Sequence, residues 1–139
     1  MNLSKNVKVI LVEAGASSGT TDLESDVVDT AGFEGCMFVG SIATANAANY
    51  AKVQQCDTSG GSYADLEGTK LVTGDNGDSF LIDIYRPRER YLKLYLERGG
   101  AATVSGDIYA ILYGPDVAPT SHGTTIDAET HISPAEGTA

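Results

Sequence analysis

The sequence predicts an all-β fold: an antiparallel β-sandwich or jelly-roll-like body over residues 1–114, followed by an extended C-terminal arm over residues 115–139. Several short runs alternate between apolar and polar residues with a period of two, which is typical of strands with one buried face. Sixteen glycines, many of them in turn clusters, separate these runs and disfavour long helices. After Tyr113 the alternation stops, and the remaining segment is rich in proline and poor in apolar side chains.

The first part of the chain contains three expected strands. A β-branched run at residues 7–13 predicts the first strand, and the polar residues 14–26 predict a loop. A short strand is expected at residues 27–28, followed by a turn at residues 31–32 and a stronger strand at residues 36–42. The following stretch carries asparagines where a helix would need better helix formers, so we expect a loop there as well.

The second part of the body predicts strands at residues 50–56, 80–85, 90–97 and 104–113. Pro87 separates two of these strands, because proline removes a backbone donor and fixes φ. We expect the following side chains to face inward: Phe80, Ile82, Ile84, Leu92, Leu94, Leu96, Val104, Ile108, Ala110 and Leu112. The alternation turns another set outward: Tyr91, Lys93, Tyr95, Asp107, Tyr109 and Tyr113.

The composition of the chain excludes some kinds of binding partner and indicates the compartment in which it folds. A net charge of −10 and a sequence pI near 4.4 argue against nucleic acid as a partner, because nucleic acid is bound by basic surfaces. The apolar run at residues 7–12 is shorter than a signal-peptide core and contains Lys8. No run approaches the roughly 20 apolar residues of a membrane span, so we expect no membrane partner and folding in the cytosol.

The chain carries few residues suited to catalysis or to metal binding, and we expect neither an enzyme nor a cofactor. Both histidines, His122 and His131, lie in the C-terminal segment, away from a rigid scaffold. Cys36 and Cys56 are interpreted as buried reduced thiols, with one disulfide as the alternative, and no pair of residues has zinc-site spacing. Residues 74–79 contain two aspartates that could attract calcium, but the remaining ligands of an EF-hand loop are missing, so we expect a plain turn.

The stretch from Tyr85 to Gly99 concentrates basic residues in an acidic chain and is the main candidate site. One interpretation is a ridge that binds an acidic partner, because arginine forms bidentate pairs with carboxylates. The other is intramolecular pairing with Asp83, Glu89, Glu97 or Asp107 across neighbouring strands. The candidate interface residues of the body are Arg86, Arg88, Arg90, Tyr91, Lys93 and Tyr95.

The C-terminal segment admits two interpretations. It cannot bury enough apolar surface to fold alone, so it is either a disordered tail or an arm that orders on a partner. In the second case Ile126 and Ile132 serve as apolar anchors, and His131 belongs to the same contact surface.

Four segments resemble a family of small decoration, or cement, proteins of tailed-bacteriophage heads: residues 27–42, 51–69, 83–94 and 131–139. The Tyr-Arg-Pro-Arg-x-Arg-Tyr run that begins at Tyr85 is the most specific of them. The resemblance implies a non-enzymatic virion structural protein, made in the host cytoplasm, that sits on the capsid exterior and stabilises the shell by bridging capsid subunits. Its implied partners are the major capsid protein and further copies of itself, as a homo-oligomer.

Two other functions fit the same sequence. The outward tyrosines Tyr91, Tyr95, Tyr109 and Tyr113 could form a stacking platform for a sugar, which would make the chain a carbohydrate-binding sandwich module on a virion surface. A tail or head-completion subunit is the third possibility, and the number of copies per particle distinguishes it from a decoration protein.

Overall fold

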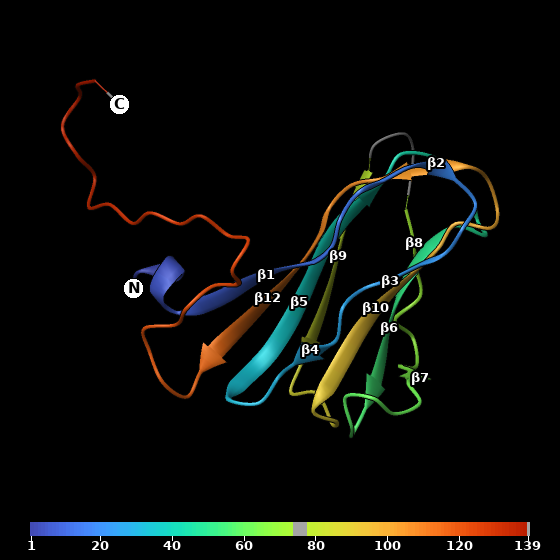
Figure 1. The fold of residues 1–139 in the computed structure, drawn as a ribbon, viewed down its shortest axis with the longest axis horizontal. Helices are drawn as coiled ribbons and strands as arrows, with labels where there is room; N and C mark the ends of the chain where they lie inside the picture. Colours follow the sequence, from blue (N-terminus) through green and yellow to red (C-terminus); the bar gives the residue numbers. More distant parts are fainter. Residues whose placement is uncertain (74–77, 139) are drawn as a thin grey trace.

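The computed structural model describes residues 1–73 and 78–138, and this part of the chain is all-β, as predicted (Figure 1). The one helix within it is the 3-10 turn η1 (Leu3–Lys5). The strands in chain order are β1 (Val7–Glu13), β2 (Ala16–Gly19), β3 (Leu23–Glu24), β4 (Val28–Asp29), β5 (Phe33–Ile42), β6 (Tyr50–Cys56), β7 (Ala64–Asp65), β8 (Leu71–Val72), β9 (Asp78–Tyr85), β10 (Tyr91–Glu97), β11 (Thr103–Ser105) and β12 (Ile108–Pro115).

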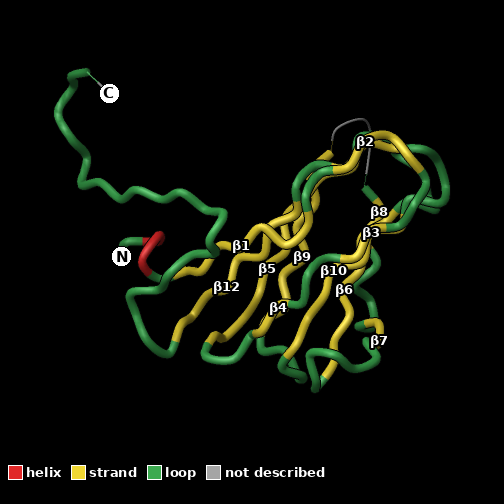
Figure 2. Tube along the Cα trace, viewed as in Figure 1, coloured by secondary structure: helices red, strands yellow, loops and turns green. Residues whose placement is uncertain are grey.

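The strands form two antiparallel sheets that pack face to face as a sandwich (Figures 1 and 2). The first sheet has the order β1-β12-β5-β11-β2, with β9 paired to the other side of β5. The second sheet has the order β3-β10-β6-β7, with β4 also paired to β10 and β8 to β6. Figure 2 shows the strands of the first sheet bending over at the end where β2 lies, which gives the sandwich a curled shape.

The inner faces of the two sheets make one core. Strict alternation in β10 buries Leu92, Leu94 and Leu96, and each of them is 0% exposed. The first sheet contributes the facing apolar residues, which include Cys36, Phe38, Ile82, Ala110 and Leu112. Burying whole leucine and phenylalanine side chains contributes on the order of 1.5–3 kcal/mol each, so this core is the main source of stability.

Most expected strands are confirmed, but residues 14–26 were wrongly expected to be only a loop. This stretch contains β2 and β3, which pair with β11 and β10 at the sheet edges. Short polar edge strands carry too little alternation to be recognised from sequence.

The inward assignment of Val104 is also wrong. Val104 is 48% exposed, whereas its neighbours Thr103 and Ser105 are buried. The ladder is irregular at β11, and Gly106 separates β11 from β12. A Cβ at Gly106 would overlap the hydroxyl of Ser41 on β5, so glycine allows the chain to approach β5 closely at this point. This break shifts the alternation by one residue between Ser105 and Ile108.

Both cysteines are free and buried, as expected for two reduced thiols. Burial is the main cause that raises the pKa of the Cys36 thiol to about 12. Cys36 therefore behaves as a small apolar core residue rather than as a reactive thiolate.

Part of the C-terminal segment lies along the free edge of β1. The backbone N–H of Thr120 donates to Lys5 O at 3.0 Å, and that of Gly123 donates to Val9 O at 2.8 Å. His122 Nδ1 accepts the N–H of Val9 at 3.0 Å, and the Thr120 hydroxyl donates to Val7 O. We call residues 120–123 the edge segment. It runs in the same direction as β1 and covers an edge that would otherwise be open to other strands.

Candidate functional site

The basic run is the connection between the two sheets. β9 belongs to the first sheet and β10 to the second, so residues 86–90, which we call the arginine loop, carry the chain from one to the other. Arg86 has a φ of 51°, a conformation that turns the chain sharply at the end of β9. Pro87 then prevents the strand from continuing.

The arginine loop packs against the turn before β5. The N–H of Arg86 donates to Glu34 O at 2.8 Å, and the N–H of Thr30 donates to Arg90 O at 2.9 Å. The Thr30 hydroxyl donates to the same carbonyl at 2.7 Å. These bonds hold the backbone of the loop, and a shallow depression of about 300 Å³ lies between the loop and the turn.

Arg90 is paired within the molecule. Its Nε and Nη2 atoms donate to Asp29 Oδ1 and Oδ2, each at 2.8 Å, in a bidentate pair. The hydrogen bond from Arg90 is the largest cause of the lowered pKa of the Asp29 carboxyl. The intramolecular interpretation is therefore confirmed for Arg90, but the expected acids were wrong. Asp29 on β4 is the partner, because β4 pairs with β10.

Arg86 and Arg88 differ from Arg90. Both are exposed, and among the described residues neither side chain has an acidic partner or a hydrogen bond. The guanidinium of Arg86 lies over the ring of Tyr85, 5.1 Å from its centroid. Arg88 lines the depression beside Thr30 and a second one beside Gln55 and Glu67. These two arginines present positive charge at one end of the sandwich.

The outer face of the second sheet carries Tyr91, Lys93 and Tyr95, and tyrosine and lysine side chains lie beside one another there. Lys93 pairs with Glu24 at 3.3 Å and lies 4.7 Å from the ring centroid of Tyr63. Other pairs on this face follow the same pattern, namely Lys52–Asp65 at 2.7 Å, Lys52 over Tyr95 at 5.0 Å and Lys70 over Tyr50 at 4.2 Å. The charges of this face are thus largely balanced within the molecule.

The four outward tyrosines do not share one surface. Tyr91 and Tyr95 lie on the outer face of the second sheet, whereas Tyr109 and Tyr113 lie on the outer face of the first. Cations also lie over the rings of Tyr91 and Tyr95, at 5.2 and 5.0 Å. A sugar platform needs free ring faces on one side of the protein, so this geometry does not favour one.

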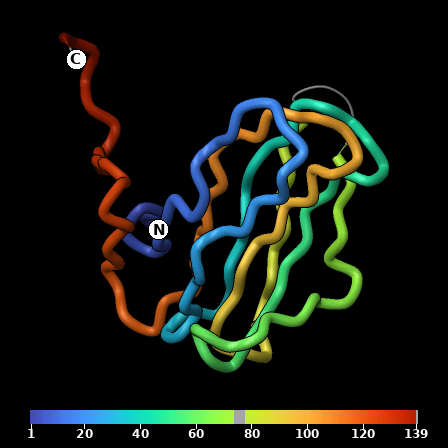
Figure 3. The backbone as a smooth tube through the Cα atoms, turned by 45° about the vertical axis from the view of Figure 1, so that its right-hand side comes forward, coloured from blue at the N-terminus to red at the C-terminus, as the bar shows by residue number. Residues whose placement is uncertain are grey.

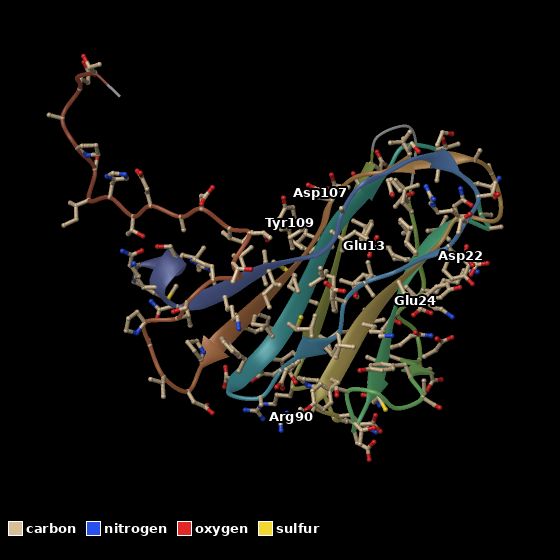
Figure 4. The ribbon with its side chains drawn as sticks, in the orientation of Figure 1. Glu13, Asp22, Glu24, Arg90, Asp107 and Tyr109 are labelled. Atoms are coloured by element: carbon tan, nitrogen blue, oxygen red, sulfur yellow. The ribbon has the colours of Figure 1, made fainter. Side chains whose placement is uncertain are left out.

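The candidate residues of the C-terminal segment lie away from the arginine loop. Ile126 is half-buried, and its N–H donates to Gly123 O at 3.0 Å. His131 contacts Glu129 at 2.9 Å, and Ile132 is 97% exposed. In Figure 4 Arg90 lies at the lower end of the sandwich, whereas the last residues extend from the side where β1 begins (Figures 3 and 4). Their role as an arm on a partner stays a prediction.

Two residues with structural roles were missed from sequence. Arg98 is only 4% exposed, and its side chain donates to the carbonyls of Thr21, Ser17 and Thr103 at 2.7, 3.0 and 2.9 Å. The sequence did contain a signal for the burial of Arg98, because this residue continues the alternating inward positions of Leu92, Leu94 and Leu96. His122 was expected to lie away from a rigid scaffold, but its ring accepts a backbone hydrogen bond from β1.

Residues 1–73 and 78–138 contain no cluster of three or more His, Cys, Asp or Glu side chains that could hold a metal ion. The possible calcium ligand Asp75 lies outside the described residues. No helix in the described part of the chain is long and apolar enough to cross a membrane. No known protein family matches the chain, and no curated protein matches it either.

Proposed function

We propose that this chain is a non-enzymatic structural protein of a tailed-phage virion that binds the outside of the capsid and stabilises the assembled shell. The observation that carries the proposal is the arginine loop, where Arg86 and Arg88 are exposed and have no acidic partner among the described residues. The same loop is the central part of the run from Tyr85 to Tyr91, through which the sequence most specifically resembles phage decoration proteins.

Charge explains why these two arginines matter. The chain has a net charge of −10, and its other basic side chains in this region are already engaged. Arg90 pairs with Asp29, Lys93 pairs with Glu24, and Arg98 is buried against carbonyl groups. Glu34 and Glu89 line the same depression, but neither pairs with Arg86 or Arg88, so these two guanidinium groups stay available to the carboxylates of a partner surface, which arginine forks suit.

Stabilisation of the shell follows from mass action. A protein that binds only the assembled shell, and not its separated subunits, shifts the equilibrium toward the assembled form. A compact sandwich that spans two capsid subunits achieves this without any catalytic group. The partners in this proposal are the major capsid protein and neighbouring copies of the chain.

The test uses capsids of the source phage that were assembled without this protein. Purified chain is added, bound copies per shell are counted after sedimentation, and the temperature of shell disruption is recorded. We expect many copies per shell and a raised disruption temperature. The double variant Arg86→Glu/Arg88→Glu is expected to bind about tenfold more weakly or worse, because each reversal replaces attraction by repulsion.

Lys70→Glu is the matched control, because Lys70 is an exposed cation on a different part of the surface. Its binding is expected to stay near that of the unmodified chain. Raised salt is expected to weaken binding, since exposed charges are screened beyond about 8 Å at physiological ionic strength. Equal binding by the double variant and the control would refute the role of the arginine loop. A few copies per particle, at one site, would favour a tail or head-completion subunit instead.

A further inference from the structure

The two sheets differ in the chemistry of their outer faces. An antiparallel sheet that faces water on one side carries polar residues at its outward positions. The second sheet follows this rule, with tyrosine, lysine, glutamine and glutamate outward on β6 and β10. The first sheet does not, because its outward positions include Val9, Leu11, Met37, Val39, Leu81 and Ile111.

These apolar side chains form continuous rows across four strands. One row is Leu11, Tyr109, Val39 and Leu81, which are direct neighbours on β1, β12, β5 and β9. The next row is Val9, Ile111, Met37 and Asp83. We call these two rows the apolar face. A mostly apolar groove of about 450 Å³ runs along the second row and is also lined by Leu3 of η1, Val7 and Tyr113.

The apolar face is open to solvent in the single chain. Leu81 is 54% exposed, and the other apolar residues of the two rows are half-buried. The largest contiguous apolar patch on a monomeric protein, commonly about 300–600 Å², is often a functional surface that another molecule covers. Asp83 is the single ionisable acid in the two rows, and the hydroxyl of Tyr113 donates to it at 2.7 Å.

We propose that the apolar face packs against the same face of a second copy of this chain, sheet on sheet. Two copies of a chain with a net charge of −10 repel one another unless they meet where acids are scarce. The second sheet's outer side carries Asp22, Glu24, Asp29, Asp65 and Glu97, and three of these acids pair with Lys93, Arg90 and Lys52, so a dimer through that side would have to remove these charges from water. The apolar face brings only one acid per copy and offers the regular surface on which sheets stack.

The size of the face sets the strength of the contact. Its four strands have seven to ten residues. At about 4.8 Å between strands and about 3.3 Å per residue, the whole outer side of these four strands, of which the apolar face is the central part, measures roughly 450 Å². Even a contact over this whole side buries only roughly 900 Å² in total, which is below the range of about 1,200–2,000 Å² for stable complexes. The dimer is therefore reversible and forms at high local concentration, such as that of copies held on one shell.

The proposal is tested with purified protein and no capsids, so its failure leaves the capsid proposal standing. Sedimentation velocity measures the oligomeric state over a range of concentrations. We expect a reversible dimer with a dissociation constant in the micromolar range. Leu81→Glu places a charge on the apolar face and is expected to raise that constant at least about tenfold. Val72→Glu is the matched control, since Val72 is a 42% exposed strand residue of the second sheet.

Circular dichroism and thermal unfolding confirm that each variant is folded. If Leu81→Glu does not fold, the milder Leu81→Ser serves in its place, and it too is expected to weaken the dimer. A wild-type chain that stays monomeric up to millimolar concentration overturns the proposal. So does a dimer that is equally stable with Leu81→Glu and with Val72→Glu. A monomeric chain whose Leu81→Glu variant loses capsid binding would assign the apolar face to the shell instead.

Discussion

Tyr113 on β12 and Asp83 on β9 are joined across the strand that separates them. The Tyr113 hydroxyl donates to Asp83 Oδ1 at 2.7 Å, and its ring passes over Gly35 of β5. A Cβ at position 35 would overlap this ring, so the contact requires glycine there. Burial, and then this hydrogen bond, raise the pKa of Tyr113 above its ordinary value of 10.0. On the other sheet, the bond from Tyr95 to Asp22 raises the pKa of Tyr95 to about 12.

These two tyrosines predict a loss of stability in alkali. A group whose pKa is higher in the folded state stabilises the fold fully below its unfolded pKa, here 10.0, and loses that effect as pH rises through the folded value. We therefore expect the free energy of unfolding to fall as pH rises from 10 toward 12. Urea unfolding at several pH values measures this, and the Tyr95→Phe/Tyr113→Phe variant should show a shallower decline.

Tyr109→Phe is the control for this series, because the Tyr109 hydroxyl makes only a 3.5 Å contact with Asp107. It removes a hydroxyl without removing a short hydrogen bond. If the double variant declines with pH as steeply as the wild type, these two tyrosines are not the cause.

Leu94 tests the core. It is 0% exposed, lies opposite Val53 in the second sheet and faces the first sheet. Leu94→Ala is expected to lower the free energy of unfolding by about 2–5 kcal/mol, because it removes buried methyl groups and leaves a cavity. Leu71→Ala provides the comparison: Leu71 is 36% exposed on the short edge strand β8, and the cost there should be clearly smaller. Similar losses in both variants would contradict the placement of Leu94 at the centre of the core.

The sequence predicted the long strands well, because their alternation is set by burial of one face. It failed where that signal is weak or broken, at β2 and β3 and at Val104. It also did not predict the apolar face. Outward positions in β1, β5, β9 and β12 are partly apolar, and such a mixed pattern is compatible with either a buried or an exposed face.

The candidate site was predicted in part. The concentration of arginines marked the arginine loop, but sequence neighbours were wrongly expected to be spatial neighbours. Glu89 and Asp83 lie close to the arginines along the chain, yet Asp29 and Glu24 are the actual partners of Arg90 and Lys93. The reason is topological: β9 and β10 are in different sheets, and β10 lies between β6 and the early strands β3 and β4. The local alternation of apolar and polar residues does not determine which distant strands become neighbours in a sheet.

Arg98 is expected to be important for stability. Its buried guanidinium links the loop before β3, β2 and β11 through three carbonyl oxygens. Arg98→Met keeps the apolar stem and leaves those carbonyls without their donor, so we expect a loss of about 3 kcal/mol or more in unfolding free energy. Arg88→Met, at an exposed position, should change it by less than about 0.5 kcal/mol. Denaturant titration compares the two, and equal stability would show that Arg98 is not needed to hold these strands together.

Two truncations separate the roles of the C-terminal segment. Removal of residues 116–139 takes away the edge segment and leaves the N–H and C=O groups of Val9 and the carbonyls of Lys5 and Val7 without their partners. Each lost bond costs about 0.5–1.5 kcal/mol, and an open strand edge invites pairing with other chains, so this protein should be less stable and should self-associate.

Removal of residues 128–139 keeps the edge segment and should leave stability nearly unchanged. That shorter truncation lacks His131 and Ile132, and if these residues act as an arm it should bind capsids more weakly. Denaturant titration and light scattering compare the two proteins with the full chain. Equal midpoints for all three would mean that the edge segment does not stabilise β1, whereas full capsid binding by the shorter truncation would make the last residues a passive tail.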